Sequence, residues 1–151
     1  MKDRIEFIRL AIVLLVLFFI GKLVVGALGG SYDLGNRLFA MVPMTVHLAL
    51  IWGAMTRAFR GEGAGSAFKT GASIALVAQI LIFGGTMLYY LLGVSTHFSD
   101  PMAIVGEARE VGLGEALGLR TFGIVVNSII GGVAGLIGFA LGGMIPAKKA
   151  A

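Results

Sequence analysis

Four polar side chains interrupt the long apolar stretches of this sequence and are the first candidates for chemistry. They are Lys22, His47, Gln79 and Asn127. A polar or ionisable group inside an apolar segment is costly to keep there, so it marks a candidate functional position. An imidazole can accept a proton or bind a haem iron, an ammonium can contact an anion, and an amide can hydrogen-bond between helices.

His47 is the candidate cofactor ligand of this set. It lies four residues after Pro43, where the missing backbone hydrogen bond of a proline attracts polar groups. The favoured interpretation is structural: a neutral imidazole that hydrogen-bonds Gln79 or Asn127 on another helix. Haem held by two histidines needs a second embedded ligand, and His97 is expected in a loop. Only a dimer that pairs His47 with its copy would supply one, so we expect no cofactor.

Lys22 lies near the end of its apolar stretch, six residues before Leu28. Its long stem can carry the ammonium to the interface between lipid and water, which is the expected role. The functional alternative is contact with an anion or substrate in an outward-facing cavity, with Asp33 as the counter-charge. Asn127 is expected to hydrogen-bond across helices.

Several reaction classes lack the residues they require. The chain has no cysteine, which excludes thiol chemistry, disulfides and cysteine metal sites. All eight carboxylates fall outside the apolar segments, which argues against exporters that carry protons on an embedded acid. No nucleotide-binding, zinc or hydrolase motif is present. We therefore expect no metal site and no enzymatic activity.

The elements that must position these side chains are apolar helices. Of the 151 residues, 58% are hydrophobic and 13% charged, with a mean hydropathy of +0.96. About 20 apolar residues suffice for a helix to cross a bilayer. The pattern predicts four transmembrane helices, at about 10–28, 38–56, 70–92 and 121–145.

A short helix is predicted in the loop between the third and fourth apolar segments. Asp100 can accept hydrogen bonds at a helix start, and Pro101 fits the first helical position. We expect an amphipathic helix at about 101–111 that lies in the membrane interface. Its apolar face would consist of Ile104, Ala108 and Val111.

The last apolar segment carries glycines at helical spacing. A stripe without side chains lets the backbone of another helix approach closely, and it gains nothing from facing lipid. The neighbour can be another helix of this chain or a second copy. The predicted packing residues are Gly131, Gly135, Gly138 and Gly142.

The basic residues predict the orientation in the membrane. The net charge of +4 is interpreted as topology and lipid contact, not nucleic-acid binding. Three basic residues flank one side, Arg37, Arg109 and Arg120. Eight flank the other, Lys2, Arg4, Arg9, Arg57, Arg60, Lys69, Lys148 and Lys149. This asymmetry predicts cytoplasmic termini, in a protein of the bacterial inner membrane.

Together these features predict an all-α integral membrane protein with one domain, 1–151, built as a four-transmembrane-helix bundle. The leading hypothesis is a non-enzymatic subunit that packs into a membrane complex or homo-oligomer through its glycine-rich last helix. One alternative is a small oligomeric channel or transporter. A second alternative is a redox anchor that binds haem or quinone through His47.

Overall fold

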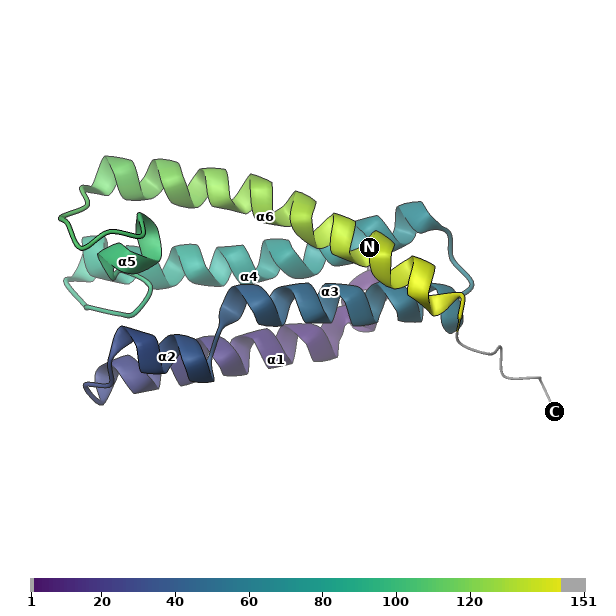
Figure 1. Ribbon diagram of the computed structural model, residues 1–151, viewed down its shortest axis with the longest axis horizontal. Coiled ribbons are helices and arrows are strands. Elements are labelled where there is room, and N and C mark those ends of the chain that lie inside the picture. Colours follow the sequence, from purple (N-terminus) through teal and green to yellow (C-terminus); the bar gives the residue numbers. More distant parts are fainter. Residues whose placement is uncertain (1, 145–151) are drawn as a thin grey trace.

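The computed structural model describes residues 2–144, which form helices and connecting loops and contain no strand (Figure 1). Four segments are long and apolar enough to cross a membrane, as the sequence predicts: 3–27, 32–58, 64–92 and 113–142. The second of these combines a short helix with a longer one. The elements are α1 (Lys2–Ala27), α2 (Tyr32–Leu38), α3 (Met41–Ala58), α4 (Ala64–Leu92), α5 (Pro101–Ile104) and α6 (Leu113–Gly142).

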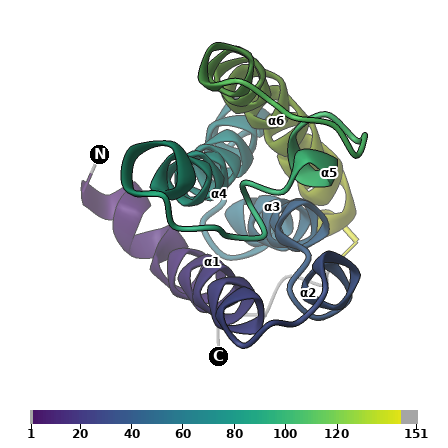
Figure 2. The same cartoon turned by 90° about the vertical axis from the view of Figure 1, so that its left-hand side faces the viewer.

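The long helices lie side by side and give the bundle two distinct ends (Figure 1). The start of α1, the α3–α4 connection and the end of α6 lie at one end, called here the N-terminal end. The opposite end, called the α5 end, holds α2, α5 and the start of α6. Helices α3 and α4 occupy the centre, with α6 packed on one side and α1 on the other (Figure 2).

Three of the long helices begin earlier than the apolar pattern predicts. Helix α1 begins at Lys2 instead of 10, α4 at Ala64 instead of 70, and α6 at Leu113 instead of 121. Charged and polar residues limit the apolar stretch, but most of them are compatible with helical backbone. The limits of an apolar segment therefore underestimate the length of the helix that contains it.

The predicted loop between the first two spans contains a helix instead. Helix α2 begins after Ser31, whose hydroxyl accepts the Leu34 N–H at 3.2 Å. The chain then leaves the helical conformation at Phe39 and Ala40 and begins α3 at Met41, not at 38 as predicted. Pro43 falls in the first turn of α3, where its missing N–H leaves no hydrogen bond unmade.

The predicted interfacial helix is shorter than expected. Its start is as predicted, because the Asp100 carboxylate accepts the Met102 N–H at 2.9 Å and Pro101 follows at the first position. The helix ends at Ile104 instead of 111. Gly106 has a φ of 75°, a left-handed conformation that terminates helices. A continuous apolar face over 101–111 therefore does not form.

The core lies between α1, α3 and α4. Leu15 and Ile74 are fully buried there. The indole N–H of Trp52 on α3 donates to the Phe7 carbonyl of α1 at 2.7 Å. This bond crosses between two helices near the N-terminal end, so it fixes how α1 lies on α3.

The glycines of α6 lie against two neighbouring helices of the same chain. Gly131, Gly135, Gly138 and Gly142 are all buried. A Cβ atom at Gly135 would meet the Ala67 carbonyl of α4, and one at Gly138 would meet the Leu50 carbonyl of α3. Helix α6 therefore approaches the backbone of α4 in its middle and that of α3 near its end.

Candidate functional site

Two cations from opposite sides of the bundle, a buried lysine and a half-buried arginine, lie at the α5 end. Lys22 comes from α1 and Arg120 from α6, and both line a cavity of about 110 Å³. Tyr32 of α2 and Phe98 of the α4–α5 loop also line it. The viewpoint of Figure 2 faces this end, where α2 and α5 lie between α1 and α6. The residues that line this cavity come from all six helices and from the α4–α5 loop.

Lys22 is buried by the short helix that follows it. Its side chain is only 5% exposed, and its Nζ donates to the Asn36 carboxamide oxygen. The ammonium also lies 5.3 Å from the centre of the Tyr32 ring and 5.2 Å from that of Phe98, within the range of cation–π attraction. The Lys22 side chain is therefore enclosed by the protein, and no ion pair between Lys22 and Asp33 forms among residues 3–144. The reason is that α2 folds over the ammonium and presents a neutral amide to it.

Arg120 completes the site from the other side. Its Nε donates to the Thr86 hydroxyl at 2.9 Å, and its Nη2 donates to the Phe98 carbonyl at 2.7 Å. Phe98 thus contacts both cations, Lys22 through its ring and Arg120 through its carbonyl. The sequence placed Arg120 among the flanking charges because its helix was expected to begin at 121. The early start of α6 is what carries this arginine into the bundle.

His97 holds the loop that presents Phe98. It lies in the loop after α4, as expected, and its side chain is buried. Its Nε2 lies 2.9 Å from the Gly30 carbonyl, and its ring packs against Gly35 of α2. The Tyr32 ring meets it edge-on. The α4–α5 loop is therefore anchored on the α1–α2 turn.

The other predicted site residues do not join Lys22. His47 is exposed on α3, and its Nδ1 lies 2.7 Å from the Pro43 carbonyl of the same helix. Asn127 donates to the Gly123 carbonyl of its own helix at 2.9 Å, and Gln79 is buried. The expected hydrogen bond between His47 and one of these amides does not form among the described residues. The face of α3 opposite to His47 packs in the core, so the His47 imidazole faces outward.

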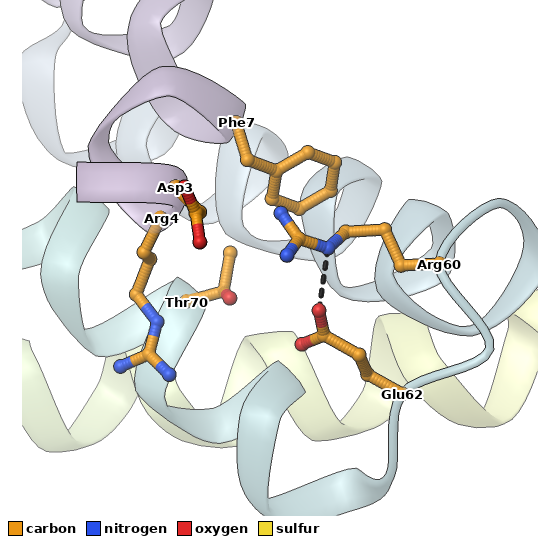
Figure 3. A pocket seen from close by; sticks show the side chains of 6 residues that line it. All are labelled: Asp3, Arg4, Phe7, Arg60, Glu62 and Thr70. Carbon is orange, nitrogen blue, oxygen red and sulfur yellow. Dashed lines mark hydrogen bonds and ion pairs between the residues drawn. The ribbon is translucent and has the colours of Figure 1, made fainter. Parts of the chain in front are cut away.

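A second cavity, of about 240 Å³, lies at the N-terminal end (Figure 3). Arg60 forms an ion pair with Glu62 at 2.5 Å and covers the Phe7 ring at 4.7 Å. The Ser66 hydroxyl donates to Glu62, and this bond together with Arg60 lowers the pKa of the Glu62 carboxyl. Asp3 and Arg4 also line the cavity. Its charges balance, so it lacks the excess positive charge of the Lys22–Arg120 site.

The Lys22–Arg120 site can bind an anion, because it presents charged N–H donors to a cavity. Among the described residues, no carboxylate or imidazole lines that cavity. Within residues 3–144, no three side chains of His, Cys, Asp or Glu gather as a metal site would require. His47 keeps one ring nitrogen, Nε2, free of its own helix, at the surface of α3.

Comparison with protein-family models, with curated proteins and with solved structures found no match to this chain.

Proposed function

We propose that this chain is a non-enzymatic, multi-pass protein of the bacterial cytoplasmic membrane that serves as a subunit of a larger membrane complex or homo-oligomer. The observation that carries the proposal is the apolar perimeter of the bundle. Large apolar side chains are exposed on every long helix, among them Leu17, Ile51, Ile80 and Ile137. In water such a surface would be unfavourable, whereas lipid or another apolar subunit covers it without cost.

The distribution of charge supports insertion across a bilayer with both termini in the cytoplasm. The basic residues Arg4, Arg57 and Arg60 lie near the N-terminal end, with the start of α1 and the α3–α4 connection. Fewer basic residues flank the α5 end, which matches the rule that cytoplasmic flanks carry the excess. Lys148 and Lys149 are also among the basic residues expected on the cytoplasmic side, but they lie outside the described residues.

Close backbone packing in the centre favours a subunit over a pore within one chain. Gly135 meets Ala67 of α4, and a Cβ at Gly53 of α3 would meet the Gly135 carbonyl. Backbones this close leave no room for a conducting path between α3, α4 and α6. The glycine stripe is thus used inside the chain, so partner subunits would contact the apolar side chains of other faces.

The test is the mass of the protein extracted from its own membrane in a mild detergent. A subunit is expected to migrate as a particle well above the 15.7 kDa of one chain. Denaturing detergent should return it to the single-chain mass. A single chain as the only species in mild detergent, at the concentration found in the membrane, would contradict the proposal.

A second candidate is a small oligomeric transporter, and the Lys22–Arg120 cavity is what favours it. A positively charged cavity near one end of the bundle suits an anionic substrate. Uptake of a labelled anion into vesicles that contain the purified protein, compared with empty vesicles, tests this function.

The redox anchor remains a third candidate through His47, whose Nε2 could bind a haem iron only at the bundle surface. An absorption spectrum of the protein in membrane extract tests it, since bound haem gives a strong band in the near ultraviolet.

A further inference from the structure

The fold brings the two cations of the α5 end to one cavity, although they lie far apart in the sequence. Lys22 and Arg120 lie on α1 and α6, which pack on opposite sides of the α3–α4 centre. At the α5 end, α2 and the loop that carries Phe98 lie between these two sides of the bundle. Phe98 contacts both cations, because Lys22 lies over its ring and Arg120 donates to its carbonyl.

Neither cation forms an ion pair in the part of the chain that the structure describes. Asp100, on the same loop as Phe98, accepts the Met102 N–H, and its carboxylate attracts Lys22 electrostatically without forming an ion pair with it. The partners of the two cations are neutral: the Asn36 amide, the Thr86 hydroxyl and the Phe98 carbonyl. Charges withdrawn from water are ordinarily paired, so a buried lysine and a half-buried arginine that line one cavity and have neutral hydrogen-bond partners favour an anion there.

Several charged donors remain available at the site. Arg120 has five N–H groups and uses two of them, which leaves three. The Lys22 ammonium has three and uses one, which leaves two. The cavity of about 110 Å³ that both residues line is well above the roughly 30 Å³ that a water molecule occupies in the liquid. A guanidinium fork beside an ammonium is the donor set that proteins use for phosphate oxygens.

In a bundle that spans a bilayer, as proposed above, the site would lie near the boundary between the headgroups and the hydrocarbon. Lys22 lies five residues before the end of α1, and Arg120 lies seven residues after the start of α6. At about 1.5 Å per residue, these positions are roughly 8 Å and 10 Å inside the helix ends. A phosphate group can therefore arrive from the aqueous end or from a phospholipid beside the bundle.

We propose that the cavity between Lys22 and Arg120 is a binding site for a phosphate group. The two cations are its ligands, and Phe98 and Asn36 hold them in place. The choice between a lipid headgroup and a soluble phosphate rests on the membrane insertion proposed above. The site itself is testable in detergent and does not depend on whether the chain is a subunit.

The first experiment measures the thermal unfolding midpoint in detergent against inorganic phosphate, with chloride at equal ionic strength as the reference. A specific site stabilises the folded protein in a saturable way as phosphate rises. The increase in the unfolding midpoint that phosphate causes should be at least halved in Lys22→Met and in Arg120→Gln. The matched control is Arg37→Gln, which removes an exposed arginine at the same end and should respond like the unchanged protein.

The second experiment identifies a lipid source by native mass spectrometry of protein extracted from membranes that contain phosphatidylglycerol. One retained phospholipid per chain, lost in Arg120→Gln and kept in Arg37→Gln, assigns the site to a headgroup. Saturable stabilisation by inorganic phosphate without a retained lipid assigns it to a soluble phosphate. If a neutral variant does not fold, Arg120→Lys and Lys22→Arg take its place and should weaken binding while retaining the charge.

The proposal is overturned if neither phosphate nor phospholipid binds, or if Arg37→Gln weakens binding as much as the cavity variants do. The first result would mean that the Asn36 amide and the two aromatic rings stabilise the buried Lys22 charge without a bound anion. The second result would mean that phosphate is attracted to the basic surface in general and not to this cavity. The mass measurement for the subunit proposal is separate from both, so either proposal can fail alone.

Discussion

Lys22 shows how one short helix changes the environment of a side chain. The ammonium lies near the end of α1, where a long stem would ordinarily reach water. Helix α2 instead covers it with the Tyr32 ring and the Asn36 amide. The cation is thereby held inside the bundle, at the cavity that Arg120 also lines.

His47 is expected to tolerate replacement. Its Nδ1 contacts only the Pro43 carbonyl of its own helix, and its side chain is exposed. The substitution His47→Gln should therefore change the free energy of unfolding by about 1 kcal/mol or less, the contribution of one hydrogen bond. Unfolding in one detergent, with the absorption spectrum recorded in parallel, measures this. Loss of a haem band or of transport with intact folding would instead show that the imidazole has a functional role.

Gly35 is expected not to tolerate a side chain. A Cβ atom there would overlap the His97 ring, which anchors the α4–α5 loop on the α1–α2 turn. The substitution Gly35→Ala should lower the free energy of unfolding by about 1–3 kcal/mol, because the ring must move in a packed site.

The control for Gly35→Ala is Gly84→Ala. That glycine is exposed in the middle of α4, and a Cβ there would meet no atom within 4 Å. Chemical denaturation of both variants in the same detergent gives the comparison. Equal effects at the two positions would mean that the His97 ring does not anchor the loop.

At the scale of the element, α6 depends on glycine for its closest contacts. The glycines that contact α4 come first along the helix, with Gly131 against Gly71, and those that contact α3 come later, with Gly142 against Ala54. The other face of α6 carries exposed apolar residues such as Val133 and Ile137. One helix thus has a face for backbone contact and a face of bulky side chains.

Methyl groups on the two parts of α6 should have opposite consequences. In Gly138→Ala, the new Cβ would meet the Leu50 backbone of α3, so the helices must separate at a cost of about 1–3 kcal/mol. In Gly123→Ala, the nearest atom lies 3.6 Å away, an ordinary contact. That variant should be neutral, or more stable by up to about 1 kcal/mol through helix propensity.

The unfolding midpoints of these two variants, with oligomer mass recorded for each, measure the difference. If Gly138→Ala left the midpoint unchanged while the oligomer dissociated, the contact would lie between copies of the chain instead of within one. If Gly123→Ala were as destabilising as Gly138→Ala, close backbone approach would not be what the glycines provide.

For the whole molecule, the asymmetry of basic residues makes a topology prediction. The chain has no cysteine, so single cysteines can report on each end of the bundle. Ala64 lies at the start of α4 near the N-terminal end, and Ser95 lies in the loop after α4. Both are exposed.

With both termini in the cytoplasm, Ser95→Cys should react with an impermeant maleimide in intact cells. Ala64→Cys should react only after the membrane is opened. The unchanged chain, which should stay unlabelled, is the control. Reaction of both cysteines from the same side would contradict four spans.

The apolar pattern by itself determined that this chain has four helices able to span a membrane. Apolar runs of this length arise from residue type alone, because bilayer thickness fixes the number of residues needed. The sequence also determined the start of α5, since Asp100 and Pro101 make a local signal that depends on adjacent residues only.

The tertiary structure alone decided which polar residues meet. Lys22 and Arg120 are 98 positions apart, and their meeting depends on the fold of α2, on the early start of α6 and on the His97 anchor. No local spacing encodes a contact of this kind, because it is the product of packing between distant elements. For the same reason the sequence marked His47, Gln79 and Asn127, whereas the fold keeps His47 at the surface and brings an arginine from a predicted flank to the cavity that Lys22 lines.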